Sequence, residues 1–202
     1  MMATKDIQEI YYPESDGKPL AETDFHLSAI AYLRETLRHL FRHVPDVYVS
    51  GCILFYYVEG QPKFFKVPDV FVVKGVAKGN RRYYQLWKEK SVPATVFEIT
   101  SNETRAEDQG AKQELYQTLG VKEYFLFDPL GEYLMPRFQG LRLQNGQYVP
   151  ILPTKDETLY SEELALMLRP SEDLLRVVDP RTGKVFPTLE ELADIIAAPK
   201  RI

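Results

Sequence analysis

The seven residues ATVFEIT, at positions 94–100, predict a β-strand, because they form a short apolar run rich in β-branched residues. Side chains alternate along a strand, so Glu98 points the same way as Val96, while Phe97 and Ile99 point the other way. Both faces are apolar, which predicts a central, fully buried strand. An unpaired buried carboxylate is costly, so Glu98 needs a basic partner, a proton or a metal ion.

The preceding apolar run carries a second acid. Asp69 is embedded in VPDVFVV, residues 67–73, which also predicts a strand. Adjacent strands lie about 4.8 Å apart, so acids at matching heights can bring their oxygens to one hard cation. Mg²⁺ binds oxygen ligands and retains several waters. The two acids together therefore predict a divalent metal site at Asp69 and Glu98.

A helix following the buried strand supplies a nearby amine. Its apolar row predicts that Lys112 borders the buried face and extends its amine toward the strand ends. Asp108, Lys112 and Tyr116 form a polar row at i, i+4 and i+8. An exposed Asp108–Lys112 pair, worth about 0.3–0.5 kcal/mol, is the alternative interpretation. The apolar row consists of Ala111, Leu115 and Leu119.

On both sides of this strand, the chain alternates helical and strand patterns. A helix from Thr23 precedes strands at 47–58, 64–73 and 94–100, a helix to Leu119 and a strand at 122–128. Thr104 and Glu107 predict a capping box for the second helix, which Gly120 ends. The order helix-strand-strand-strand-helix-strand predicts an α/β fold with a mixed sheet.

The C-terminal part predicts additional β structure. Asn145–Gly146 indicates a hairpin turn, and residues 177–186 indicate another hairpin. A short helix is predicted after Ser161, and Thr188 with Glu191 predicts a capping box for a last helix. We expect one domain over residues 1–202, with a core at 20–150 and a β/α extension at 151–202.

Composition limits the possible classes of protein. The chain has 202 residues, 45% hydrophobic and 27% charged, as in soluble globular proteins. The one cysteine, Cys52, excludes an intramolecular disulfide and is predicted to be a buried apolar residue. The N-terminus lacks a signal-peptide core, and no run approaches a membrane span, so we expect a cytoplasmic protein without membrane association.

Charge is distributed unevenly along the chain. The net charge is −4, yet residues 63–90 contain eight Lys or Arg against two acids. Such a strip can attract a polyanion to one face, although a charge run taken alone favours a solvated loop. His39 and His43 lack a third ligand and are interpreted as surface residues, and His26 is assigned a structural role at the helix start.

Asp69 after a proline, Glu98 and a nearby lysine together resemble the PD-(D/E)XK nuclease superfamily. The closest resemblance is to the Uma family of bacterial restriction-endonuclease-like proteins, through VPDVFVV and VFEITSNETRAEDQGAKQELYQTLGVKEYFLFDP. It spans about residues 20–150. The superfamily places a lysine two residues after the acid, where this chain has Thr100, so the resemblance implies that Lys112 supplies the amine.

The resemblance implies a restriction-endonuclease-like core and Mg²⁺- or Mn²⁺-dependent hydrolysis of DNA by a homodimeric endonuclease. Asp69, Glu98 and the Ile99 carbonyl would hold the metal, and Lys112 would complete the catalytic set. Glu22 is a further acidic candidate, and Glu35 a weaker one. The alternatives are a catalytically inactive DNA-binding or interaction module on the same fold, and a purely structural Glu98–Lys112 ion pair.

The segment KGNRRYYQLWKEK, residues 78–90, lies between the two acids in sequence and is predicted to flank the cleft. Its Arg81, Arg82 and Lys88 would neutralise DNA phosphates, which positions DNA without specifying its sequence. Three aromatic residues of this segment would either stack on bases or pack into the core. They are Tyr83, Tyr84 and Trp87.

Overall fold

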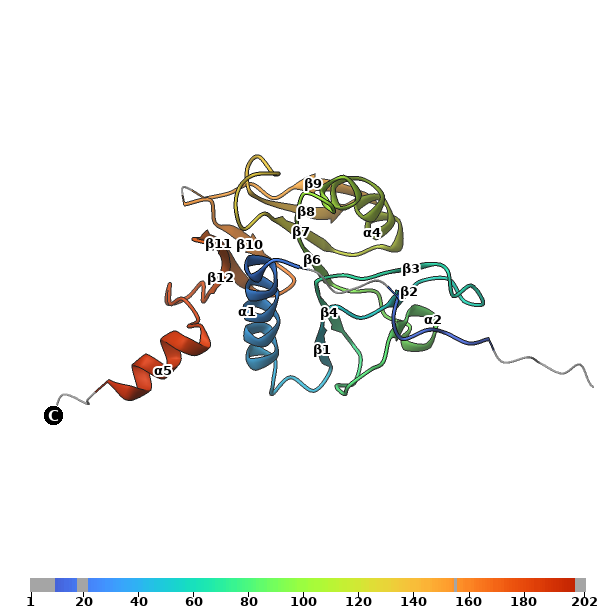
Figure 1. The fold of residues 1–202 in the computed structure, drawn as a ribbon, viewed down its shortest axis with the longest axis horizontal. Helices are drawn as coiled ribbons and strands as arrows, with labels where there is room; N and C mark the ends of the chain where they lie inside the picture. Colours follow the sequence, from blue (N-terminus) through green and yellow to red (C-terminus); the bar gives the residue numbers. More distant parts are fainter. Residues whose placement is uncertain (1–9, 18–21, 155, 199–202) are drawn as a thin grey trace, which may run out of the picture.

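A six-stranded mixed sheet forms the centre of the protein (Figure 1). The computed structural model describes residues 10–17, 22–154 and 156–198. The strand order is β1-β4-β6-β7-β8-β9, and only β6 and β7 pair in parallel. These strands are β1 (Val47–Ser50), β4 (Val70–Lys74), β6 (Thr95–Ile99), β7 (Glu123–Phe127), β8 (Phe138–Gln144) and β9 (Gln147–Pro150).

The parallel pair requires a crossover, which a helical segment provides. It runs through α3 (Arg105–Glu107), a π-helical stretch η1 (Asp108–Lys112) and α4 (Gln113–Leu119), and ends at Gly120 in the left-handed conformation. The predicted order of helices and strands is therefore confirmed. This crossover matters for the site because it places Lys112 over the central strand.

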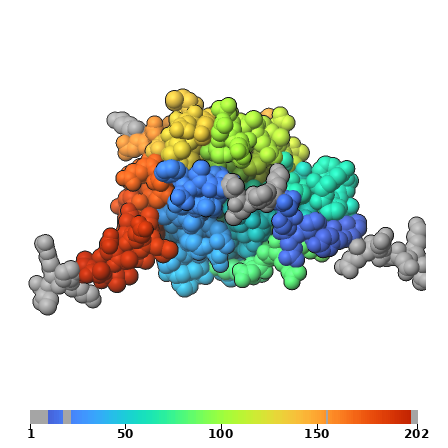
Figure 2. All heavy atoms as spheres, viewed as in Figure 1, coloured from blue at the N-terminus to red at the C-terminus, as the bar shows by residue number. Residues whose placement is uncertain are grey.

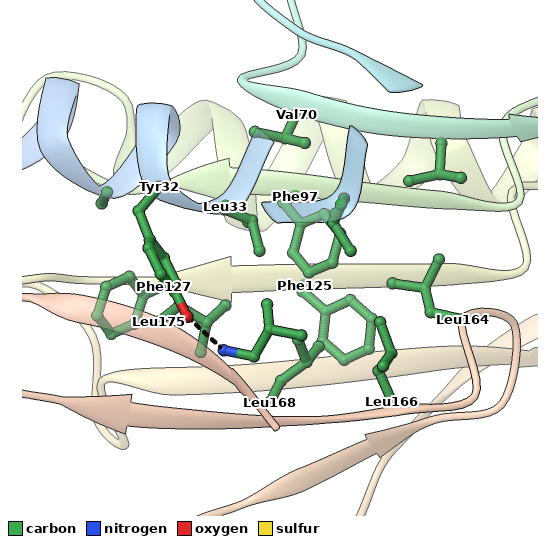
Figure 3. Packing of buried hydrophobic residues seen from close by; sticks show 14 of the residues in the cluster. Tyr32, Leu33, Val70, Phe97, Phe125, Phe127, Leu164, Leu166, Leu168 and Leu175 are labelled. Carbon is green, nitrogen blue, oxygen red and sulfur yellow. Dashed lines mark hydrogen bonds between the residues drawn. The ribbon is translucent and has the colours of Figure 1, made fainter. Parts of the chain in front are cut away.

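Helix α1 (Asp24–Leu40) covers one face of the sheet. Thr23 caps it by accepting a hydrogen bond from the His26 backbone N–H. The apolar side of the helix packs on the sheet residues that point toward it, including Phe97 and Phe125 (Figure 3). The crossover covers the opposite face, where Tyr116 packs with Val96, Tyr124 and Leu126. The central strand is therefore buried on both sides, as its sequence predicts.

The C-terminal strands complete the core on the α1 side. The sheet of β10 (Leu159–Ser161), β11 (Leu166–Ser171) and β12 (Leu174–Val178) contributes Leu166, Leu168 and Leu175 to the cluster around α1. The Tyr32 hydroxyl accepts from the Val177 backbone N–H at 3.2 Å (Figure 3). Residues predicted as an extension thus share a hydrophobic cluster with the nuclease-like core.

The last helix, α5 (Leu189–Ala197), projects from the body of the protein (Figures 1 and 2). Thr188 and Glu191 form the predicted capping box. Among the helices in the described ranges, none is long and apolar enough for a membrane span.

Two predicted strands are each divided in the structure. Residues 47–58 separate at Gly51 into β1 and β2 (Phe55–Tyr56), and residues 64–73 separate into β3 (Phe65–Lys66) and β4. A Cβ atom on Gly51 would lie 1.9 Å from the Asp69 carbonyl oxygen, so only glycine permits this approach. The second small sheet has the order β3-β2-β5, with β5 at Tyr84–Gln85 followed by α2 (Leu86–Glu89).

Three local predictions are wrong. Thr104 does not form the capping box, because its hydroxyl accepts from the Ser101 N–H and its backbone is already helical. The helix predicted after Ser161 is a turn between β10 and β11. Cys52 is exposed, with φ of 54°, because it lies in the turn that leaves β1.

Candidate active site

Asp69 and Glu98 lie side by side at one end of the central sheet. Strands β4 and β6 are antiparallel, with Val70 opposite Phe97. Asp69 comes one residue before β4, so continuing this register by one position places it opposite Glu98. Directly opposite residues of an antiparallel pair point to the same face. The two acids predicted from the sequence are therefore neighbours.

Glu98 is fully buried, and both of its carboxylate oxygens accept hydrogen bonds. Lys112 Nζ lies 2.8 Å from Oε2, and the Tyr116 hydroxyl donates to Oε1 over 3.0 Å. Both donors belong to the crossover helix on the same face as Glu98. A carboxylate accepts about four hydrogen bonds, so each oxygen retains a lone pair for a further ligand.

Lys112 bridges two carboxylates. Its Nζ is 2.8 Å from Glu98 Oε2 and 2.8 Å from Asp108 Oδ1, and Asp108 is also buried. Asp108 and Lys112 are the first and last residues of the π-helical stretch. Such stretches occur frequently at functional sites. The interpretation of this pair as an exposed surface ion pair is thus wrong, because the helix turns both side chains into the protein.

Asp69 is held by a backbone donor and lies beside a histidine. Its Oδ2 accepts from the Ile99 N–H over 2.7 Å, and His26 Nε2 lies 3.6 Å from the same oxygen. His26 Nδ1 in turn lies 3.3 Å from Glu22 Oε2. The Asp69 side chain is 18% exposed, whereas that of Glu98 is inaccessible. Asp69 is thus the member of the acid pair that solvent reaches.

The pKa values of the buried acids are raised. Burial raises the pKa of Glu98 to about 8, opposed by the positive charge of Lys112 and reinforced by Asp69. Burial also raises the pKa of Asp108, again opposed by Lys112. The single lysine therefore does not compensate for the desolvation of two acids.

The pKa values of the two basic groups, Lys112 and His26, are raised as well. Burial lowers the pKa of Lys112, but the charges of Glu98, Asp108 and Asp69 outweigh it and raise the pKa above its usual range. Burial also opposes protonation of His26, yet Asp69 and Glu22 raise its pKa overall. The pKa values of all four groups are raised, so each group holds its proton more tightly and the site attracts positive charge. The groups are Glu98, Asp108, Lys112 and His26.

The structure brings some of the predicted site residues together and leaves others apart. The structure brings Asp69, Glu98 and Lys112 together, with Ile99 adjacent through its N–H. Glu22 reaches this group only through His26. Glu35 is exposed and forms ion pairs with Arg34 and Arg38, away from the acid pair.

The segment 78–90 is largely engaged in contacts within the protein. Arg81 pairs with Glu89 and Arg82 with Glu14. Tyr84 is fully buried in the core, which excludes it as a base-stacking residue in this conformation. Tyr83 and Trp87 both lie against Tyr12. Neutralisation of phosphates by Arg81, Arg82 and Lys88 stays a prediction.

His26 and Asp108 both belong to the site, although the sequence predicted neither of them as a site residue. His26 belongs to the cap only through its backbone, and its ring lies between Glu22 and Asp69. The signal for Asp108 was its row with Lys112 and Tyr116, all three of which are buried. For His26 the sequence holds only the i, i+4 spacing from Glu22.

Thr100, at the position where the superfamily pattern has a lysine, is buried, and its backbone N–H donates to Phe127. A pocket of about 310 Å³ opens beside it. The start of α1, the segment after β6 and the loop after β7 line this pocket, and His26 and Thr100 belong to its wall. Neither Asp69 nor Glu98 lines the pocket, and His26, which does, lies 3.6 Å from Asp69 Oδ2 through its Nε2.

Within the residues that the structure describes, no three His, Cys, Asp or Glu side chains are grouped to hold a metal ion. A cation at Asp69 and Glu98 therefore needs backbone or water oxygens as further ligands. The donor set nevertheless suits a hard divalent ion, because its side-chain ligands are carboxylates with an excess of negative charge.

A mixed sheet crossed by a helix, with an aspartate, a glutamate and a lysine gathered at one sheet end, defines the class of restriction-endonuclease-like proteins. The Uma2 family, described as "Putative restriction endonuclease", matches residues 5–171. The chain belongs to this family, as the resemblance implied.

A solved structure supports the same fold. It is described as a putative nuclease belonging to DUF820 from Anabaena variabilis ATCC 29413. The similarity has a TM-score of 0.54 and covers 75% of this chain and 82% of that chain. The two sequences are 12% identical, so the likeness shows the fold alone. No curated protein matches the chain.

Proposed function

We propose that the protein is a Mg²⁺- or Mn²⁺-dependent endonuclease that hydrolyses DNA phosphodiester bonds. The observation that carries this proposal is the excess of acids around one amine. Lys112 contacts two buried carboxylates, and Asp69 adds a third acid opposite Glu98. A structural ion pair needs one acid for one amine, so it leaves Asp69 and Asp108 unexplained.

Asp69 and Glu98 would hold the metal ion, with the Ile99 carbonyl and water as further ligands. When bound, Mg²⁺ or Mn²⁺ would polarise a phosphoryl oxygen and lower the pKa of a coordinated water. The Ile99 N–H fixes Asp69 Oδ2 at 2.7 Å, and the Tyr116 hydroxyl fixes Glu98 Oε1. These donors orient both acids without occupying all of their lone pairs.

Lys112 contributes positive charge. Because the surrounding carboxylates raise its pKa, the amine stays protonated at neutral pH and cannot serve as a general base. Its role would be to orient the attacking water or to stabilise charge that develops on the phosphate. His26 would help to position Asp69 through Oδ2, the same oxygen that accepts from the Ile99 N–H.

The decisive experiment measures nicking of supercoiled plasmid with Mg²⁺ or Mn²⁺ for the wild type, Asp69→Asn and Glu98→Gln. The wild type should nick and both variants should lose activity by at least about 10²-fold, as when a group that stabilises a transition state is removed. Full activity in Glu98→Gln would refute the assignment. DNA binding without nicking by the wild type would establish the inactive binding module instead.

Metal binding distinguishes the site from a structural pair. Calorimetric titration with Mn²⁺ should detect binding to the wild type and a marked loss in Asp69→Ala. A structural Glu98–Lys112 pair predicts the same weak binding before and after this substitution.

A homodimer would allow both DNA strands to be cut. The support is α5, whose apolar residues are exposed on a helix that projects from the body. Exposed apolar patches of this kind often mark protein interfaces. The residues are Leu189, Leu192, Ile195 and Ile196. Sedimentation equilibrium should give a dimer for the wild type and a monomer for Leu192→Glu with Ile195→Glu.

A further inference from the structure

A basic groove of about 440 Å³ lies between α1, β1 and the segment 78–81. Five cationic residues line it, and none of its lining residues is an acid. We call this feature the basic groove, and its cations are Arg34, Arg38, Arg42, Lys78 and Arg81. Two segments far apart in sequence, residues 34–53 and 78–81, line the groove. Only the second belongs to the basic strip at residues 63–90.

The groove follows the flank of α1 that begins at the candidate active site. His26, Ile30, Arg34 and Arg38 are spaced at i+4 along the helix, so they form one row. At 1.5 Å per residue, Arg34 and Arg38 lie about 12 and 18 Å along the axis from His26. Arg42 continues the row in the turn after the helix.

The opposite wall of the groove also adjoins the acid pair. Ser50 and Ile53 line the groove, and Gly51 between them packs directly against the Asp69 carbonyl. The Cys52 thiol donates to the same oxygen at 3.8 Å. One end of the basic groove therefore lies next to Asp69, because Gly51, between two lining residues, packs on the Asp69 carbonyl.

The positive charge of the groove is only partly compensated. Glu35 is shared by Arg34 and Arg38, and Glu89 pairs with Arg81. Arg42 and Lys78 donate to the backbone carbonyls of His39 and Phe41, which leaves their charge in place. Five cations thus face two acids, and both acids lie outside the groove lining.

We infer that the basic groove binds phosphate groups of a DNA strand and leads that strand to Asp69 and Glu98. The inference deepens the proposed function and rests on it for the identity of the polyanion. Arginine suits this ligand because its planar donor fork matches phosphate oxygens. The arginines recognise phosphate groups, which either a DNA strand or free phosphate could supply.

The test uses the full chain and a fluorescein-labelled 20-bp DNA duplex in EDTA, so that binding is measured without cleavage. The groove variant is Arg38→Gln with Arg42→Gln, both exposed in the wild type. The matched control is Lys122→Gln with Arg181→Gln, also exposed and with the same change of net charge. Fluorescence anisotropy gives Kd over a series of KCl concentrations.

We expect the groove variant to bind DNA at least about 10-fold more weakly at low salt. The slope of log K against log salt should fall by about 2, because each lost phosphate contact removes about 0.9. The single variants Arg38→Gln and Arg42→Gln should each lower the slope by about 1. The control should remain within twofold of the wild type. An unchanged Kd and slope in the groove variant would overturn the inference.

Two further measurements separate the possible outcomes. Inorganic phosphate that binds the wild type tightly, with DNA binding insensitive to Arg38 and Arg42, would replace the DNA strand by a free anion and overturn the inference. Plasmid nicking tests the proposed function separately. Groove-dependent DNA binding without any nicking would refute the endonuclease and leave the basic groove as a DNA site.

Discussion

The Tyr116 hydroxyl donates a hydrogen bond to Glu98 Oε1 over 3.0 Å, and both side chains are fully buried. The contact joins the crossover helix to the central strand at the candidate metal site. It also accounts for part of the tolerance of a carboxylate in an apolar strand, because a buried acid needs donors on both oxygens.

Removing the Tyr116 hydroxyl should therefore weaken both the fold and the site. Above about pH 8, where Glu98 is ionised, we expect Tyr116→Phe to lower the free energy of unfolding by about 1.5–3 kcal/mol, the range for a hydrogen bond to a charged group. Nicking should fall as well, because Glu98 loses one of its orienting donors. Urea denaturation and the plasmid assay measure the two effects. Unchanged activity with reduced stability would limit Tyr116 to a structural role.

The position of Glu98 illustrates what the sequence predicts well. Its strand is recognisable because both faces are apolar, and the alternation of side chains gives the direction of its carboxylate. The apolar row on the following helix places Lys112 at the buried border. Both predictions depend on the periodicity of residues close in sequence, and the folded chain has the strand and helix that this periodicity indicates.

The surroundings of the site were less predictable because they depend on contacts between distant segments. No periodic pattern indicates that His26, 43 residues before Asp69, lies beside it. The π-helical turn at Asp108–Lys112 changes which residues face inward, and helical periodicity does not specify such a turn. The bend at Gly51, by contrast, could be anticipated from a glycine within a strand-like run, and a close approach to the Asp69 backbone fixes it.

Replacing Lys112 should show how strongly the acids depend on it. Lys112→Met leaves Glu98 and Asp108 without their shared cation, and breaking a buried pair in this way costs about 3–5 kcal/mol. Urea denaturation should show this loss, and nicking should disappear.

The double variant Glu98→Gln with Lys112→Met provides the control. A neutral amide needs no cation, so the double variant should recover part of the lost stability while remaining inactive. Additive losses of stability from the two substitutions would contradict the coupling between these residues.

The raised pKa of Glu98 predicts a dependence of stability on pH in EDTA. The folded value of about 8 lies above the ordinary 4.5, so the folded state binds a proton more tightly than the unfolded chain. This stabilisation is complete below about pH 4.5 and is lost as pH rises through about 8. One proton accounts for at most about 1.4 kcal/mol per pH unit.

The comparison with Glu98→Gln isolates this contribution. The raised pKa values of His26 and Asp108 act in the same direction, whereas that of Lys112 acts only above pH 10.5. We expect the unfolding free energy of the wild type to fall more steeply between pH 5 and 8 than that of Glu98→Gln, by up to about 1.4 kcal/mol per unit. Parallel profiles in urea denaturation would show that Glu98 is already ionised at pH 5.

Gly51 offers a test of the backbone that supports Asp69. An alanine Cβ at this position would lie 1.9 Å from the Asp69 carbonyl oxygen and 2.9 Å from its carbon, so the backbone of one strand must move. Overpacking of this kind costs about 1–3 kcal/mol. Because the displaced residue is Asp69, Gly51→Ala should reduce Mn²⁺ affinity and nicking beyond what the loss of stability explains.

The matched control for this prediction is Gly110→Ala. Gly110 lies in the π-helical stretch, and a Cβ atom there meets no heavy atom within 4 Å. Alanine is also the better helix former, by about 0.5–1 kcal/mol, so the control should be at least as stable as the wild type. Calorimetric Mn²⁺ titration at a temperature where both variants are folded separates a displaced Asp69 from simple unfolding. Wild-type metal affinity in folded Gly51→Ala would show that the close approach at Gly51 does not determine the position of Asp69.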